Sequence, residues 1–123
     1  MKYEITIESD FSAAHRLREY KGKCETIHGH NWKVQAVFAA GKLNKTGIVM
    51  DFAAAKKYLN QIMDELDHKD LNKHEFFIKN NPTSELIAKF IFNRLKTLIK
   101  NKVNLIKVSV WETPTSCATY SIN

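Results

Sequence analysis

In CETIHGHNWKVQAVF, residues 24–38, two histidines lead directly into a regular alternation of apolar and other side chains. Residues two apart in an extended chain point to the same side, so His28 and His30 can hold one ion together. The apolar side chains that continue this phase are Trp32, Val34, Ala36 and Phe38. The stretch therefore predicts, from His30 onward, a strand with two candidate metal ligands at its start.

A similar strand is predicted upstream, because residues 2–8 also alternate between apolar and polar side chains. If that strand runs on in phase, His15 falls on its apolar side. The polar loop that follows would make the two strands a hairpin-like pair and could bring His15 near His28 and His30. Three imidazoles with an open fourth position are typical of catalytic zinc sites, although histidine ligation alone does not exclude other first-row metals.

Two helices are predicted in the middle of the chain. Apolar residues recur at helical spacing over 52–66, and Asp51 is suited to cap that helix. A second helix opens near Thr83, whose hydroxyl can cap it, and continues to about Lys100.

Two more strands, at 103–112 and 117–122, complete the order β-β-α-α-β-β. We expect an α+β fold in a single domain, residues 1–123, with a four-stranded antiparallel sheet and two helices on one face. Such a sheet has two open edges, and closing several sheets into a β-barrel removes them. The sequence therefore predicts a homo-oligomer.

Composition is that of an ordinary globular protein, with 44% hydrophobic and 26% charged residues among 123. No apolar run approaches the roughly 20 residues that span a bilayer, and no apolar signal core opens the chain, so we expect a cytoplasmic protein without a membrane partner. Cys24 and Cys117 are then expected to be reduced thiols. The net charge of +6 comes from dispersed lysines, which fits a solvated surface or an anionic substrate, and we expect no nucleic-acid partner.

Three candidate residues keep more than one interpretation at this point. Cys24 is a buried thiol, a fourth metal ligand in a closed site, or a thiolate that acts as a base or a nucleophile. Asp67 and His68 end the first helix, where spacing alone favours a simple helix terminus over an acid–base pair.

Glu112 breaks the apolar pattern of its strand. Alternation places it on one face with Ile106, Val108 and Val110, and places Leu105 on the other face. Glu112 is therefore either at a strand end in water or a buried carboxylate with a partner. An amino-pyrimidinone edge, as in a pterin or guanine, would offer it two parallel hydrogen bonds.

Together, six motifs resemble the 6-pyruvoyl-tetrahydropterin synthase family, and in particular its bacterial branch, the 6-carboxy-tetrahydropterin synthases of queuosine biosynthesis. The motifs cover nearly the whole chain: Phe11–His15, Cys24-x-x-x-His28-Gly29-His30, Gly47–Phe52, Leu66–Asn72, Asn81–Glu85 and Trp111–Thr113.

This resemblance implies a tunnelling fold (T-fold), in which ββααββ subunits assemble β-barrels, commonly as a homohexamer built as a dimer of trimers with active sites between subunits. It also implies residue roles. They are zinc binding by His15, His28 and His30, proton removal by Cys24, an acid–base relay of Asp67 and His68, and pterin contacts from Glu112, Thr83 and Ser84.

The substrate that the resemblance implies is 7,8-dihydroneopterin triphosphate. The carboxy branch releases acetaldehyde and triphosphate and leaves 6-carboxy-5,6,7,8-tetrahydropterin, whereas the pyruvoyl branch eliminates triphosphate and keeps the side chain. The short chain and compact cysteine–histidine spacing favour the carboxy branch, and Cys24 argues against a third branch that carries glutamate there. A non-catalytic, zinc-stabilised pterin-binding oligomer is the alternative outside enzymology.

Overall fold

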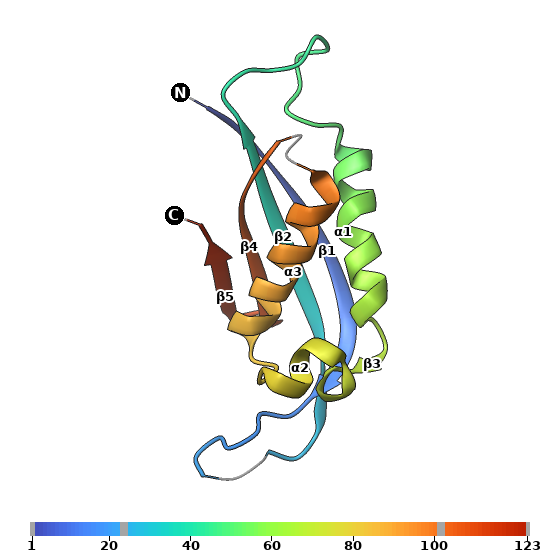
Figure 1. Ribbon diagram of the computed structural model, residues 1–123, viewed down its shortest axis with the longest axis vertical. Helices are drawn as coiled ribbons and strands as arrows, with labels where there is room; N and C mark the ends of the chain where they lie inside the picture. Colours follow the sequence, from blue (N-terminus) through green and yellow to red (C-terminus); the bar gives the residue numbers. More distant parts are fainter. Residues whose placement is uncertain (1, 23–24, 101–102, 123) are drawn as a thin grey trace.

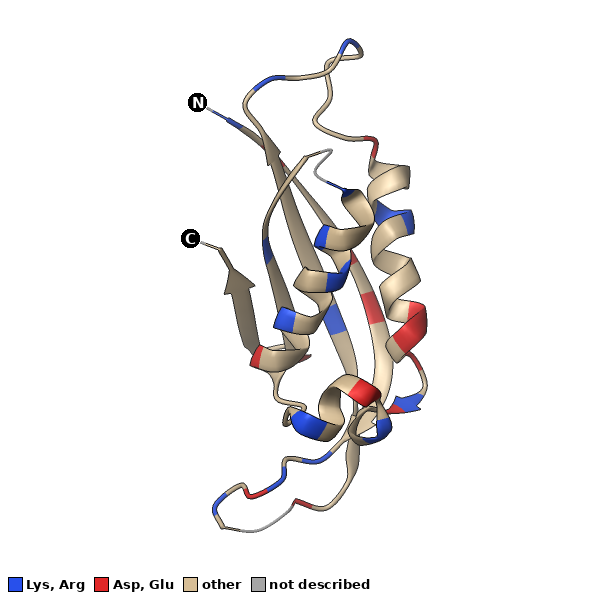
Figure 2. Ribbon diagram, viewed as in Figure 1, with Lys and Arg blue, Asp and Glu red and all other residues tan. Residues whose placement is uncertain are grey.

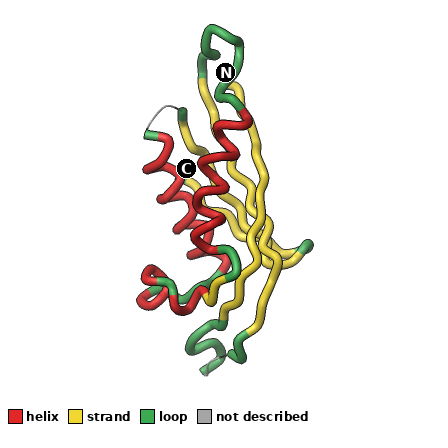
Figure 3. The backbone as a smooth tube through the Cα atoms, turned by 90° about the vertical axis from the view of Figure 1, so that its right-hand side faces the viewer, coloured by secondary structure: helices red, strands yellow, loops and turns green. Residues whose placement is uncertain are grey.

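The computed structural model describes residues 2–22, 25–100 and 103–122, and it shows helices on one face of a twisted sheet (Figures 1 and 3). The strands in chain order are β1 (Tyr3–His15), β2 (His28–Ala40), β3 (Lys69–Asp70), β4 (Asn104–Thr113) and β5 (Ser116–Ser121). The helical segments are α1 (Phe52–Leu66), the 3₁₀ turn η1 (Leu71–Lys73), α2 (Glu75–Lys79) and α3 (Ser84–Ile99). The predicted α+β class is confirmed.

The two long strands at the centre of the sheet form a hairpin-like pair, as predicted. β1 and β2 are antiparallel over thirteen residue pairs, from Tyr3 opposite Ala40 to His15 opposite His28. One alternating set of apolar residues in each strand faces the helices, where Phe11 and Trp32 stack with ring centroids 5.8 Å apart. Because β1 stays in phase along its whole length, His15 is carried onto this inner face at the strand end.

Both predicted helix caps are present. The Asp51 side chain accepts from the backbone N–H of Ala54, and Thr83 Oγ1 accepts from the N–H of Leu86 at 3.1 Å. Each cap satisfies one of the backbone donors left over in a first helical turn. The apolar stripes of α1 and α3 then close the core against the sheet.

The sheet has five strands in the order β3-β1-β2-β4-β5, one more than the sequence predicted. The additional strand, β3, is two residues long and pairs with β1 in parallel. The short helical segments η1 and α2, which follow β3, were also not predicted. Residues 44–50 form an irregular loop, in which the Asn44 side chain accepts from the backbone N–H groups of Thr46 and Ile48.

The predicted alternation of β4 is wrong at its beginning because the pairing with β2 shifts there. Val37 pairs with Lys107 but Phe38 pairs with Leu105, so Ile106 is an extra residue in a β-bulge. The bulge turns Leu105 into the core beside Val108 and leaves Ile106 only half-buried. Glu112 lies beyond the shift and keeps the inward phase that the sequence predicts.

Charged residues are spread over the helices, strands and loops, and no one element of the described part of the chain collects the lysines and arginines (Figure 2). This distribution agrees with a solvated surface as the source of the positive charge. Among the helices of the described residues, none is both long and apolar enough to cross a membrane.

Candidate metal centre and active site

Three histidines converge where β1 ends and β2 begins. His15 pairs with His28 in the β1–β2 register, and Ala13 pairs with His30 one step further in. The centroid of the His15 ring lies 4.8 Å from that of the His28 ring and 5.3 Å from that of the His30 ring. One ring nitrogen from each histidine lies within 4.8 Å of the other two, so the triad could hold a metal ion.

Backbone carbonyls orient two of these rings. His15 Nδ1 is 2.8 Å from the carbonyl of Pro82, and His28 Nδ1 is 2.9 Å from the carbonyl of Thr26. A carbonyl can only accept, so Nδ1 carries a proton in each ring, and in a neutral ring Nε2 then keeps a free lone pair. This is the usual arrangement of a metal-ligating histidine, in which one nitrogen donates to the protein and the other binds the metal.

The buried nitrogens of the triad fit a metal ion well. His15 is 1% exposed, and within the described residues Nε2 of His15 and Nε2 of His30 are buried without a hydrogen-bond partner. Burial lowers the pKa of His15, although the Pro82 carbonyl and the Glu112 carboxylate oppose this shift. A buried, unpaired and neutral imidazole nitrogen is costly in a protein interior, and metal ligation would satisfy it.

Glu112 lies next to the triad near the end of β4, where it is half-buried and has partners. Its Oε1 is 3.5 Å from His30 Nε2, and its Oε2 is 3.9 Å from His15 Nε2. The Ser84 hydroxyl donates to the same Oε2 at 3.3 Å. The Glu112 side chain is 34% exposed, so it contacts the histidines and remains accessible to a ligand.

Thr83 caps α3, and Ser84 is the first residue of that helix. The Thr83 hydroxyl is used as the helix cap, as the sequence predicts. Ser84, which was named only through the family resemblance, is the residue of the two that contacts Glu112.

The side chains of Asp67 and His68 contact each other at the end of α1. Asp67 Oδ1 accepts from the backbone N–H of Ser12 at 2.8 Å, and Asp67 Oδ2 lies 2.9 Å from His68 Nδ1. The Ser12 N–H chiefly, and His68 next, lower the pKa of the Asp67 carboxyl. The ring of His68 is 83% exposed, and within the described residues neither member of the pair bonds to the three histidines.

Cys24 lies outside the described residues. Its neighbour Glu25 is tied to the opposite arm of the loop, because Glu25 N–H donates to the carbonyl of Leu17 at 3.0 Å. The Glu25 carboxylate accepts from the N–H of Leu17 in return, also at 3.0 Å.

The comparison with known proteins agrees with this arrangement. The family model described as 6-pyruvoyl tetrahydropterin synthase matches residues 4–123. The chain belongs to this family.

Three relatives carry three different functional names. A 6-carboxy-5,6,7,8-tetrahydropterin synthase of Haemophilus influenzae is 34% identical, with 96% of this chain and 98% of that protein covered. A dihydroneopterin monophosphate aldolase of Pyrococcus furiosus is 38% identical, with 91% of each covered. The solved structure of the Caenorhabditis elegans 6-pyruvoyl tetrahydropterin synthase superposes with a TM-score of 0.87 at 31% identity, covering 100% of this chain and 97% of that one.

Two contributors to this synthase-family site were missed in the sequence. The Pro82 carbonyl orients His15, but a backbone group leaves no side-chain signal. Trp32 packs edge-on against His15 and His30, with ring centroids 4.9 and 5.3 Å away, and its indole N–H donates to the Ala13 carbonyl. Its position two residues after His30, in the same strand phase, was the available signal.

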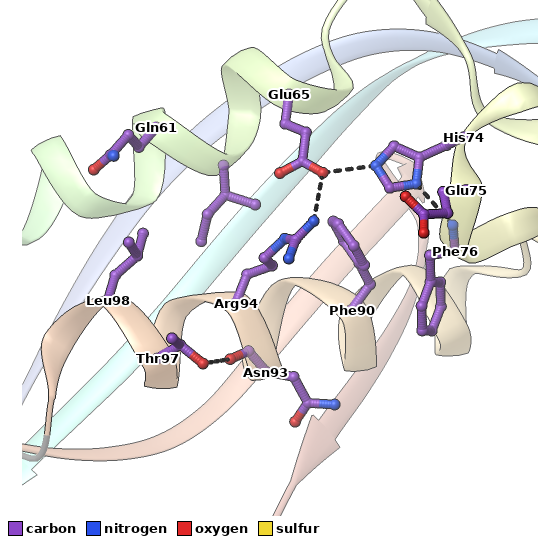
Figure 4. Close-up of a pocket in the computed structure, with 11 residues that line it drawn as sticks. Gln61, Glu65, His74, Glu75, Phe76, Phe90, Asn93, Arg94, Thr97 and Leu98 are labelled. Atoms are coloured by element: carbon purple, nitrogen blue, oxygen red, sulfur yellow. Dashed lines mark hydrogen bonds and ion pairs between the residues drawn. The ribbon is translucent and has the colours of Figure 1, made fainter.

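A cavity of about 590 Å³ lies elsewhere in this family member, on the helical side between α1, α2 and α3 (Figure 4). Glu65 Oε2 is its polar centre, 2.7 Å from His74 Nε2 and 2.9 Å from an Arg94 guanidinium nitrogen. The Arg94 guanidinium also lies 5.0 Å from the centre of the Phe90 ring. Because these groups bond to one another, the cluster is best explained as a link between the three helices. A smaller hollow, of about 250 Å³, adjoins His30.

Proposed function

We propose that this chain is a zinc-dependent 6-carboxy-5,6,7,8-tetrahydropterin synthase that acts in queuosine biosynthesis. It would convert 7,8-dihydroneopterin triphosphate and one molecule of water to 6-carboxytetrahydropterin, with loss of acetaldehyde and triphosphate. The observation that carries the proposal is a histidine triad with unpartnered buried nitrogens beside an inward-facing carboxylate, in a chain of the tetrahydropterin synthase family.

The metal would be held by His15, His28 and His30, and three neutral imidazoles suit zinc. When bound, it would polarise the oxygens of the substrate side chain and stabilise negative charge that develops there. Glu112 would accept two hydrogen bonds from the amino-pyrimidinone edge of the pterin. The Ser84 hydroxyl, which donates to Glu112, would fix the direction of that carboxylate, while Thr83 lies next to it at the start of α3.

Cys24 would act as the base that takes a proton from the substrate side chain. Asp67 keeps its negative charge because its pKa is lowered, so it can hold the Nδ1–H of His68 and leave Nε2 to exchange protons. The exposure of His68 supports a site that is completed by a second subunit. We therefore propose a single T-fold domain that assembles as a cytoplasmic homo-oligomer, a dimer of trimers with the active sites between subunits.

The second candidate is the 6-pyruvoyl-type reaction, and the close superposition with the worm synthase favours it. Glu112 and the triad would serve both reactions, because the two differ in the fate of the side chain rather than in pterin recognition.

The test is to incubate the metal-loaded protein with 7,8-dihydroneopterin triphosphate and identify every product by mass. Acetaldehyde together with 6-carboxytetrahydropterin is the expected result. Triphosphate release with a retained three-carbon side chain would replace the proposal with the pyruvoyl reaction. An unchanged substrate that nevertheless binds would support the non-catalytic pterin-binding oligomer.

A further inference from the structure

β1 ends at His15, but the irregular segment that follows it makes strand-like hydrogen bonds, and its partners on one side are side chains. The Arg16 N–H donates to Asn72 Oδ1 at 2.8 Å, and the Arg16 carbonyl accepts from Asn72 Nδ2 at 3.0 Å. Two residues later, Arg18 makes the same pair of bonds with Asn81, at 2.9 and 3.0 Å. A side-chain amide carries a donor and an acceptor side by side, so each asparagine replaces one backbone partner of a β-ladder.

Leu17, between the two arginines, bonds to the opposite side. Its N–H donates to the Glu25 carboxylate and its carbonyl accepts from the Glu25 N–H, both at 3.0 Å. Alternate residues of segment 16–18 thus bond in opposite directions, as in the interior of a sheet. Segment 16–18 therefore lies between Glu25, which precedes β2, and the two asparagines that flank α2.

The Asn81 amide lies beside the contact that orients His15. Asn81 precedes Pro82, whose carbonyl is 2.8 Å from His15 Nδ1. The Asn81 carbonyl also accepts from the Thr83 N–H at 2.8 Å, at the cap of α3. The short segment 81–83 therefore contacts both the His15 ring and the Arg18 backbone, so displacing Asn81 would move the carbonyl that sets the ring direction.

We propose that Asn72 and Asn81 are positioning residues of the metal centre, whose amides fix the chain beside His15 and thereby aim its Nε2. The inference rests on the proposed function only in requiring the metal that the function uses. Removing a group that orients a ligating histidine typically weakens metal affinity about 10–100-fold. Asn81 acts through the segment that holds Pro82 and Asn72 acts through Arg16 alone, so Asn81 has the larger effect.

The experiment compares Asn81→Ala and Asn72→Ala with Asn80→Ala in the full chain. Asn80 is a matched control because it directly precedes Asn81 and donates one side-chain bond at the end of α2, to the Phe76 carbonyl at 2.9 Å. Affinity for Zn²⁺ is measured by competition with a chelator, and the visible absorption spectrum of the Co²⁺ form reports ligand geometry. Circular dichroism verifies that each variant is folded.

We expect Asn81→Ala to weaken metal binding about tenfold or more and to change the Co²⁺ spectrum. Asn72→Ala should change both in the same direction, and Asn80→Ala should change neither. Should the alanine variant not fold, Asn81→Asp carries the test, because it keeps the acceptor for Arg18 N–H and loses the donor.

A folded Asn81 variant with wild-type affinity and spectrum would overturn the inference while leaving the proposed function intact. A wild-type chain that binds no metal would overturn both. A variant that loses thermal stability but binds metal as Asn80→Ala does would show a structural role only, which also contradicts the inference.

Discussion

Glu112 accepts a hydrogen bond from Ser84 and lies within 3.9 Å of two triad nitrogens, with one third of its side chain exposed. The Glu112→Gln substitution keeps the shape of this side chain but removes its charge and one of two acceptor oxygens. We expect the affinity for a pterin analogue to fall about tenfold or more, because a charge-assisted pair of bonds is lost. Zinc affinity should change much less, since the three histidines remain.

Isothermal titration of the pterin and of zinc measures the two effects separately. Glu85→Gln is the matched control, because Glu85 is an exposed carboxylate in the first turn of the same helix that carries Ser84. Equal pterin affinity in the Glu112 and Glu85 variants would remove Glu112 from the binding site.

The role of Cys24 as the catalytic base rests on the sequence alone, because Cys24 lies outside the described residues. The Cys24→Ala variant should keep its fold and its metal but lose turnover by at least about 10²-fold, a typical contribution of a general base. Cys117→Ala is the control, since this exposed thiol lies on β5. Loss of the metal from the Cys24 variant would show instead that the thiol is a fourth ligand.

At the scale of elements, the Glu65 cluster joins α1, α2 and α3. Burial raises the pKa of the Glu65 carboxyl, but its bonds to Arg94 and His74 more than compensate and place the pKa below the ordinary 4.5. A carboxyl with a lowered folded pKa stabilises the protein above its unfolded pKa, and this stabilisation is lost as the pH falls through the folded value. The helix layer is therefore expected to loosen below about pH 4.5.

The measurement is the melting temperature of wild type, Glu65→Gln and Glu75→Gln between about pH 6 and pH 3. Wild type should lose more stability on acidification than Glu65→Gln, whose profile should be flatter. Glu75→Gln, at an exposed carboxylate that lines the same cavity, should follow the wild type. Parallel profiles for wild type and Glu65→Gln would contradict the assigned role of the cluster.

The elements themselves were largely predictable because each has a strong local signal. Alternation indicated β1 and β2, and side-chain caps marked the starts of α1 and α3. The two-residue β3 was not predictable, since its pairing with β1 depends on tertiary contacts. The extra residue at Ile106 was not predictable either, because a bulge depends on the register of the neighbouring strand.

At the scale of the whole molecule, the sheet brings together residues from distant parts of the sequence. The register of β1 with β2 places His15 beside His28, and the inward phase of β4 brings Glu112 to His15 and His30. The triad was predictable because its histidines follow the two-residue alternation of the strands. Glu112 was predictable because it is a charged residue at an apolar position of that alternation. The Pro82 carbonyl and the asparagine amides were not, because their function depends on which chain segment lies opposite them.

The central claim is that this architecture holds one catalytic metal ion at the three histidines. The most direct measurement is the metal content of the purified wild-type chain and of His28→Ala, with circular dichroism confirming that both are folded. We predict about one zinc ion per chain in the wild type and its loss in the folded variant. Full retention of zinc by the folded His28→Ala variant would contradict the account.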